Sequence, residues 1–336
     1  MGAPAIPARM AALMVTELAP DYGGTALVDM PVPVPVDGQA LVHVRAASVN
    51  FPDLLMTRGE YQLKPPLPFT PGMEFAGQVV GVGPGVAGAM VGRAVIGGNR
   101  YGAMAGYVCV PADTLRAKPD ALDWAAAAAY RAVYLTAYVS LVRRAAVAPG
   151  EWVLVHGAAG GVGLACVDLA RHLGARVIAT GSSAQKLAMV RQLYAPDAVI
   201  DLSAGDFRDE VKRLTGGRGA DVIIDPVGGD VFTQSTRCIA FDGRLLVVGF
   251  AGGTIATLPS NIPLIKGFSV MGVRAGEYGR QFPDRGAENL AAIDALVTSG
   301  AVRPHIHAAM PLSQWRAGFN ALAHRQVVGK VVLVPD

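Results

Sequence analysis

A glycine-rich segment directly after a short apolar run carries the most specific chemistry of the chain. Residues 152–156 (WVLVH) have the composition of a buried parallel strand, and an apolar helical stretch follows at 164–173. Between them lies Gly157, followed by six small or apolar residues: Ala158, Ala159, Gly160, Gly161, Val162 and Gly163. Small residues at this spacing allow a tight turn and let the backbone approach a pyrophosphate, which then lies at a helix N-terminus. The pattern predicts a dinucleotide site, with a glycine-rich turn that binds nothing as the alternative.

The end of the next expected strand, 176–180, bears on which dinucleotide binds. Sites for NAD usually place Asp or Glu about 20 residues after the glycines, where the acid holds the ribose 2′-hydroxyl. Here the strand runs into Thr180, Gly181, Ser182 and Ser183, with no acidic residue. The sequence therefore favours NADPH as the cofactor.

Length and composition bound the class of protein. The chain has 336 residues, of which 52% are hydrophobic, so it can form two domains with a large core. A net charge of +3 without a basic run gives no support for nucleic-acid binding. Three scattered cysteines, Cys109, Cys166 and Cys238, argue for a reducing, cytoplasmic location and against a disulfide framework. The longest apolar stretch, 125–142, contains Arg131, so we expect a buried helix there and no membrane span.

The order of the expected elements predicts two kinds of domain. Short β-branched runs broken by glycine and proline fill residues 10–119, which indicates a β-rich domain. Strands at 198–200, 221–224 and 244–248 then alternate with helices at 184–193, 206–214 and 231–239, as in a doubly wound parallel sheet. A last strand of this sheet is expected at 268–273. The fold class is thus α/β, and we place domain boundaries at 1–124, 125–274 and 275–336.

Five motifs together resemble one family. They are Asn50-x-x-Asp53, Pro71-Gly72-Met73-Glu74-x-Ala76-Gly77, Tyr134-Leu135-Thr136-Ala137-Tyr138, the loop 158–163, and Gly329-Lys330-Val331-Val332. This combination resembles the medium-chain dehydrogenase/reductase superfamily, in its zinc-independent quinone oxidoreductase branch. The resemblance implies a GroES-like β-rich catalytic domain formed by both chain ends, a Rossmann domain between them, and an active site in the cleft.

The resemblance also bears on metal binding. Zinc members of the superfamily carry histidine where this chain has Met73, and cysteine where it has Val49-Asn50, so no metal site is expected. His305 and His307 could share a strand face, but two histidines without a third ligand are more often surface or core residues. Glu74 is expected to accept backbone hydrogen bonds.

Further residue roles are implied by the resemblance. It places Asn50 and Tyr61 near the hydride acceptor, Thr136 on the nicotinamide side, and Lys186 at the 2′-phosphate. Gly249, Phe250 and Ala251 follow a strand at its carboxyl end, where open α/β sheets bind ligands. The alternatives are that Asn50 is a turn residue and that Tyr61 packs on Pro65 or Pro66. Asp53 is interpreted as a helix N-terminal residue and His156 as a packed core residue.

These observations lead to one expected function and two alternatives. The expected function is NADPH-dependent hydride transfer to a small-molecule quinone or to the activated double bond of an enone. Arg274 and Arg280 could instead hold an unsaturated acid or an acyl thioester, unless they pair with Glu277, Asp284 or a partner subunit. The alternative of another class is a catalytically silent NADPH-binding protein with a structural or regulatory role. We also expect a homodimer through the edge strand 268–273, unless a loop covers that edge.

Overall fold

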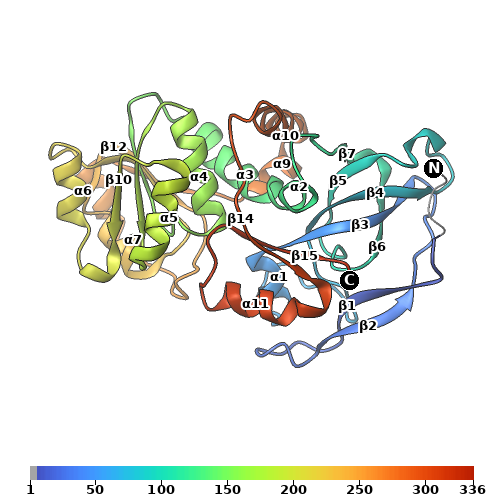
Figure 1. Ribbon diagram of the computed structural model, residues 1–336. Helices are drawn as coiled ribbons and strands as arrows, with labels where there is room; N and C mark the ends of the chain where they lie inside the picture. Colours follow the sequence, from blue (N-terminus) through green and yellow to red (C-terminus); the bar gives the residue numbers. More distant parts are fainter. Residues whose placement is uncertain (1–5) are drawn as a thin grey trace. The chain divides into compact units, whose positions relative to one another are not determined.

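The structure, a computed structural model, describes residues 6–336, apart from the side chain of Ala204. The chain forms two compact units (Figure 1). Residues 131–303 make one unit, and the remaining residues at both chain ends make the other. The crossings between units therefore come at 130/131 and 303/304, later than the boundaries expected at 124/125 and 274/275.

Packing explains both differences. Helix α2 (Trp124–Ala129) packs on strands β3, β4 and β15 of the β-rich unit. Helices α9 (Ala275–Gln281) and α10 (Pro283–Thr298) pack on α3 (Arg131–Tyr138) of the other unit. Arg143 fixes α10 there, because its guanidinium donates to Asn289 Oδ1 and to Glu288 Oε2, each at 2.7 Å.

The β-rich unit contains a seven-stranded sheet in the order β14-β15-β3-β4-β5-β7, with β6 also paired to β3. Its strands are β3 (Gln39–Val49), β4 (Glu74–Val82), β5 (Ala94–Gly98), β6 (Tyr107–Pro111), β7 (Arg116–Ala117), β14 (Ile306–Pro311) and β15 (Lys330–Val334). A separate hairpin joins β1 (Arg9–Val15) to β2 (Thr25–Pro31). Three short 3-10 helices (Gly88–Met90, Ala112–Thr114 and Leu312–Gln314) and the helices α1 (Phe51–Thr57) and α11 (Trp315–Ala323) complete the unit.

Alternating apolar side chains form the core of this unit. On β3, Val42 and Val44 are buried, and they pack in one cluster with Phe75 of β4, Val331 of β15 and Phe319 of α11. Because β15 pairs with β3, the C-terminal strand brings its first residues beside the end of β3. This pairing positions the polar cluster described below.

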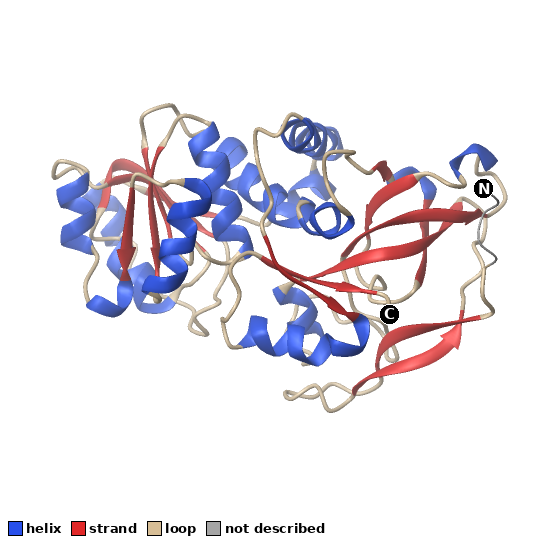
Figure 2. Ribbon diagram, in the orientation of Figure 1, coloured by secondary structure: helices blue, strands red, loops and turns tan. Residues whose placement is uncertain are grey.

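The second unit is built on six parallel strands in the order β10-β9-β8-β11-β12-β13. The strands are β8 (Trp152–Val155), β9 (Arg176–Gly181), β10 (Ala198–Asp201), β11 (Ala220–Asp225), β12 (Ile239–Val247) and β13 (Ser269–Gly272). The helices between them are α4 (Gly161–His172), α5 (Ala184–Tyr194), α6 (Arg208–Leu214), α7 (Gly229–Ser235) and α8 (Asn261–Lys266), with a 3-10 turn at Leu202–Ala204. Figure 2 shows helices on both sides of these strands. The expected doubly wound sheet is confirmed.

Two expected helices differ from the observed elements. The stretch 125–142 is not one helix but three pieces: α2, α3 and a π-helix over Val139–Arg144. The helix expected at 231–239 ends at Ser235, and Ile239 begins β12. A short apolar run fits a buried helix and a buried strand equally well, so periodicity could not place this boundary.

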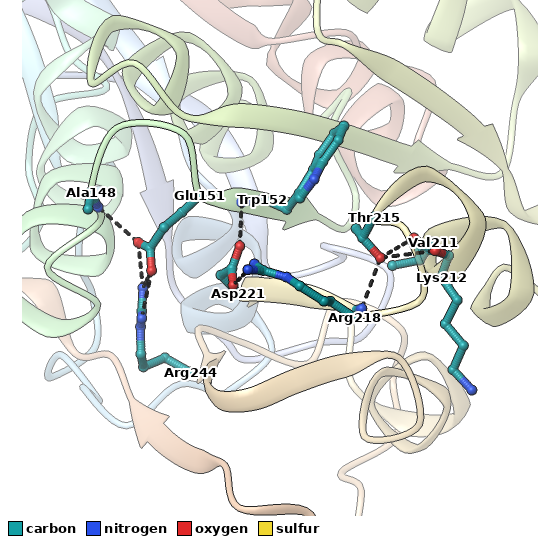
Figure 3. Close-up of polar contacts among 10 residues, drawn as sticks. Ala148, Glu151, Trp152, Val211, Lys212, Thr215, Arg218, Asp221 and Arg244 are labelled. Atoms are coloured by element: carbon teal, nitrogen blue, oxygen red, sulfur yellow. Dashed lines mark hydrogen bonds and ion pairs between the residues drawn. The ribbon is translucent and has the colours of Figure 1, made fainter.

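Polar side chains join the amino ends of β8 and β11 to each other and to the middle of β12 (Figure 3). The carboxylate of Glu151 accepts from the Ala148 N–H at 2.8 Å and from both terminal nitrogens of Arg244 on β12, the shortest contact being 2.7 Å. Asp221 on β11 accepts from the Trp152 N–H at 2.8 Å. These contacts fix β8 relative to its neighbours.

Across residues 6–336, no helix is both long enough and apolar enough to span a membrane.

Candidate functional site: a dinucleotide loop and a buried polar cluster

The turn between β8 and α4 has the geometry of a dinucleotide loop. The N–H of Ala158 donates to Thr180 O at 2.9 Å, which joins the turn to β9. A Cβ on Gly163 would lie 2.2 Å from Gly157 O and 2.7 Å from Ala158 Cα, so only glycine lets α4 approach the turn this closely. A Cβ on Gly160 would meet its nearest atom, Gly157 O, at 3.3 Å.

The first turn of α4 can bind an anion. The N–H groups of Gly161, Val162 and Gly163 are the first three of the helix, and such groups have no acceptor within their own helix. Free N–H groups and the helix dipole favour a phosphate at this end. The loop 158–163 therefore fits the pyrophosphate of a dinucleotide.

The end of β9 lacks an acid, as the sequence indicated. Ser182 is exposed, and Ser183 is the N-cap of α5, where its Oγ accepts from the Lys186 N–H at 3.4 Å. The capping role of Ser183 went unnoticed in the sequence. It leaves the hydroxyl proton of Ser183 available for a second acceptor.

The loops after β11 and β12 pack on each other at the carboxyl ends of the strands. Ala251 donates its N–H to Pro226 O at 2.9 Å, and Phe250 beside it is partly exposed. Asp225 at the end of β11 shapes the first loop, because its Oδ1 accepts from the N–H groups of Val227 and Gly228 at 2.8 and 2.9 Å. Burial raises the pKa of Asp225. The expected cofactor residues Gly249, Phe250 and Ala251 thus lie on a loop held by another loop.

Two polar residues in this unit have settled partners. Thr136 Oγ1 donates to Ala132 O at 2.9 Å within α3, so only its lone pairs remain for a ligand. His156 is fully buried, with its ring nitrogens 2.8 Å from Thr180 Oγ1 and Ser235 Oγ. Burial lowers the pKa of His156 to about 3, which keeps the ring neutral. The expectation that His156 is a packed core residue is confirmed.

In the β-rich unit, four polar side chains form one buried cluster: Asn50, Asp53, Glu74 and Lys330. Asn50 lies between β3 and α1, and Asp53 is in the first turn of α1. Glu74 is the first residue of β4 and Lys330 the first of β15. The antiparallel pairing of β3 with β4 and with β15 brings them together.

Asp53 fixes the backbone of this cluster. Its Oδ2 accepts from the Asn50 N–H at 2.8 Å, and its Oδ1 accepts from the Gly72 N–H at 2.9 Å. Burial raises the pKa of Asp53 to about 7, against the lowering effect of these two N–H groups and of Lys330. Asp53 is thus a helix N-terminal residue, as expected, that also anchors the loop before β4.

Lys330 and Glu74 hold the Asn50 side chain. Lys330 Nζ lies 2.5 Å from Asn50 Oδ1, 3.2 Å from Val49 O and 3.4 Å from Glu74 Oε1. Asn50 Nδ2 donates to Glu74 Oε1 at 3.1 Å. Asn50 is therefore more than a turn residue, and Glu74 has side-chain partners that the sequence did not suggest.

Lys330 was not predicted as a site residue. It appeared in the sequence only as part of the Gly329-Lys330-Val331-Val332 motif. Lysine at the start of an apolar strand was the available sign, because a lysine is rarely buried without a partner.

Other expected residues have more ordinary surroundings. Tyr61 packs against the apolar cluster of Val15, Met56 and Phe69, and its hydroxyl bonds to none of the residues that the structure describes. Arg280 pairs with Glu277 at 2.7 Å, and Arg274 lies 3.9 Å from the same carboxylate. For these arginines the structure favours pairing within their own helix turn.

The histidine pair also has a local partner. His307 Nδ1 lies 3.4 Å from the Val328 N–H, which donates to it. Within residues 6–336, no group of three or more metal-ligating side chains comes together.

Sequence comparisons agree with both units. Residues 36–120 match the family model of the alcohol dehydrogenase GroES-like domain, and residues 161–292 match that of the zinc-binding dehydrogenases. Quinone oxidoreductase-like protein 2 of Mus musculus is 41% identical over 303 residues, which cover 90% of this chain and 86% of the mouse protein. The chain belongs to the quinone oxidoreductase family of the medium-chain dehydrogenases/reductases.

Two further members show how far the likeness extends. Quinone oxidoreductase of Sus scrofa is 32% identical over 319 residues, covering 93% of this chain and 95% of the pig protein. The structure of mycobacterial Rv1454c complexed with NADPH superposes with a TM-score of 0.88 at 32% identity, covering 97% of this chain and all of that one. The protein described here is thus an oxidoreductase with a GroES-like unit and a Rossmann-like unit.

Proposed function

We propose that this oxidoreductase is zinc-independent and transfers hydride from NADPH to a quinone or to the activated double bond of an enone. One observation carries the proposal: the buried Asn50 amide has one N–H on Glu74, and its second N–H has no acceptor among the described residues. A fixed amide donor is what such an acceptor needs at its oxygen.

NADPH is the proposed cofactor, and when bound it supplies the hydride. The loop 158–163 holds the pyrophosphate. Ser182, Ser183 and Lys186 hold the ribose 2′-phosphate, which no acid after β9 repels. Thr136, Gly249, Phe250 and Ala251 line the nicotinamide side. The NADPH complex of the related mycobacterial protein supports this assignment.

The acceptor chemistry follows from the charge that arrives with the hydride. In a quinone or an enone this electron density is delocalised onto oxygen, where a hydrogen-bond donor stabilises it. Asn50 would donate a hydrogen bond from its second Nδ2–H to that oxygen, and solvent would supply the proton that neutralises it. Tyr61 is a second proposed contact to the acceptor, made by the aromatic ring edge of its half-buried side chain.

Zinc independence is proposed from the side chains at the relevant positions. Met73 and Asn50 offer a thioether and an amide, which are poor ligands for Zn²⁺. Glu74, the neighbouring carboxylate, already has an ammonium 3.4 Å away. A divalent cation at this place would have to displace or repel Lys330.

The proposed setting is a homodimer in the cytoplasm. The three cysteines of the chain are free, and Cys166 and Cys238 are buried, which suits a reducing compartment.

An absorbance assay of NADPH oxidation tests the proposed reaction, with an ortho-quinone and a short enone as acceptors. The parent should oxidise NADPH with at least one of them. Asn50→Ala should lose about 10²-fold in kcat/KM while its NADPH affinity, followed by fluorescence, stays at the parental value. Tyr61→Phe is the matched comparison, since it keeps the ring and removes only a hydroxyl. Tight NADPH binding without turnover of either acceptor would overturn the proposed acceptor class; adding an unsaturated acid and an acyl thioester to the assay then separates the other acceptor class from the catalytically silent alternative.

A further inference from the structure

We infer that Lys330 is a positioning residue, which orients the Asn50 amide and strengthens its free N–H as a donor to the acceptor oxygen. The inference rests on the proposed function, because it assigns Asn50 to the acceptor. Neither the sequence motifs nor the family resemblance gave Lys330 this role.

The two neighbours of Asn50 specify the same orientation of its amide. Lys330 Nζ has only protons to offer, so the oxygen of Asn50 must face it at 2.5 Å. Glu74 Oε1 needs a proton, so the nitrogen must face it at 3.1 Å. A flipped amide would place an NH₂ group against the ammonium and an oxygen against the carboxylate. The ion pair therefore sets the direction of the remaining Nδ2–H.

The contact with Lys330 also changes the strength of that donor. A charged donor on the amide oxygen draws electron density from the nitrogen, and hydrogen bonds joined in this way strengthen one another. The effect is larger in a site that excludes water, and both Lys330 and Asn50 are buried. As negative charge develops on the acceptor, the Asn50 N–H carries part of the Lys330 charge to it.

The backbone holds Lys330 where this contact requires it. Gly329 has φ +83°, and a Cβ there would lie 2.4 Å from His305 O. Lys330 also donates its own N–H to His305 O at 3.2 Å, and its Nζ donates to Val49 O at 3.2 Å. The ammonium is thus tied to the residue that precedes Asn50 as well as to the Asn50 side chain.

A purely structural ion pair predicts a different geometry. If Lys330 served only to neutralise Glu74, its shortest contact would be to the carboxylate, yet Nζ is nearer to Asn50 Oδ1 than to Glu74 Oε1. A buried ion pair is also weak evidence for stability, because an apolar pair of similar volume often replaces it without loss.

The test is a double-mutant cycle on the hydride-transfer step. Lys330→Met alone would remove the ammonium beside the buried Glu74 carboxylate, so Lys330→Met is combined with Glu74→Gln and compared with Glu74→Gln alone. Each is made with and without Asn50→Ala. Thermal melts and NADPH affinity, measured by fluorescence, establish that all variants fold and bind cofactor.

When Asn50 is present, we expect Lys330→Met with Glu74→Gln to oxidise NADPH in a single turnover about 10-fold more slowly than Glu74→Gln alone, with little change in KM. In the Asn50→Ala background it should cause no further loss. An equal loss in both backgrounds, or none in either, overturns the inference. If Asn50→Ala itself keeps the parental rate, the proposed role of Asn50 fails and the inference fails with it. If Asn50→Ala slows NADPH oxidation but adding Lys330→Met to Glu74→Gln does not, the role of Lys330 is rejected while the proposed role of Asn50 stands.

A spectroscopic measurement is independent of turnover. An isotope-labelled enone bound together with oxidised NADP⁺ reports the strength of the hydrogen bond at its oxygen through its carbonyl stretching frequency. Lys330→Met with Glu74→Gln should move this frequency, relative to Glu74→Gln alone, toward the value in a solvent that donates no hydrogen bonds. An unchanged frequency means that Lys330 does not act through the amide, even if the parent should reduce neither acceptor.

Discussion

Asp53 is a titratable residue of the polar cluster whose charge state is altered by burial. It has no exposure to solvent and accepts two backbone N–H bonds. Burial nevertheless raises its pKa to about 7, well above the value of an aspartate in an unfolded chain. Between these two values the folded state binds more protons than the unfolded state.

This difference predicts a pH dependence of stability. Asp53 contributes most to stability below pH ~4, and the contribution is lost as the pH rises toward ~7, by at most about 1.4 kcal/mol per pH unit. Denaturant unfolding of the parent and of Asp53→Asn, measured between pH 4 and ~8, checks it. The difference in unfolding free energy between parent and variant should shift against the parent as the pH rises. A constant difference would show that Asp53 does not titrate in this range.

Lys186 gives a second prediction at the residue scale. Lys186→Ala should weaken NADPH binding by about 10- to 100-fold, because a charge-assisted contact to the 2′-phosphate is lost. NADH lacks that phosphate, so its affinity should change little. Titration of both nucleotides by fluorescence measures the two dissociation constants. Equal losses for the two nucleotides would contradict the assignment of Lys186. Lys212→Ala is the control, because Lys212 is an exposed lysine on α6.

The residues of the polar cluster show what the sequence could provide. Asn50 and Asp53 could be found because their spacing matches a motif and a helix start. Lys330 could not be joined to them, since it lies 280 positions later than Asn50 and only the pairing of β15 with β3 brings it near. Tyr61 was expected near the acceptor from the family alone, and its packing on Val15 and Phe69 is set by tertiary contacts.

At the scale of elements, the turn from β8 to α4 uses its glycines for two different purposes. Gly163 permits close packing of the helix on the turn, where a Cβ would lie 2.2 Å from Gly157 O. A Cβ on Gly160 would meet only that same oxygen, at 3.3 Å, which is a tight contact but a much smaller overlap. Gly163→Ala should therefore destabilise the fold, by about 1–3 kcal/mol as for other overpacked sites.

Gly160→Ala is the matched variant for this prediction. It should unfold closer to the parental denaturant concentration than Gly163→Ala does, and it should lose NADPH affinity, since the added methyl would lie where we propose that the pyrophosphate approaches. Denaturant melts and nucleotide titration separate the two effects. If Gly160→Ala were the less stable of the pair, the division of roles between these glycines would be wrong.

The existence and order of these elements followed from periodicity, but their ends did not. Strand β9 and helix α5 were predicted nearly to the residue, because glycine and serine mark their limits. The alanine-rich stretch 125–142 lacks such marks, and it divides where the chain passes from one unit to the other, after Tyr130. The composition of this stretch could not predict that the chain passes from one unit to the other after Tyr130.

At the scale of the whole molecule, the open edge of the parallel sheet is the main unexplained surface. Strand β13 ends the sheet, and among residues 6–336 it pairs only with β12. Large apolar side chains are exposed beside it: Phe241 (82%) next to Gly267, and Leu264 (82%) and Ile265 (73%) on α8. An edge with unpaired backbone groups and an apolar border favours pairing with another chain.

We therefore predict that a second copy of the chain pairs along β13 and covers α8. A two-fold axis would place the same strand and the same apolar residues against each other, so each side chain is buried twice in one interface. Ile265→Glu would then put two buried charges into that interface, and the charged variant should be monomeric at concentrations where the parent is a dimer. Val34→Glu is the matched control, because Val34 is as exposed as Leu264 but lies in the β-rich unit.

Light scattering coupled to size-exclusion chromatography measures the mass of each variant. We expect a dimer for the parent and for Val34→Glu, and a monomer for Ile265→Glu with an unchanged circular dichroism spectrum. A monomeric parent would reject the dimer. A parent dimer that survives Ile265→Glu would place the interface elsewhere. The exposed apolar side chains beside β13 would then require another partner, because burying them would gain about 25 cal/mol of free energy for each Å² removed from water.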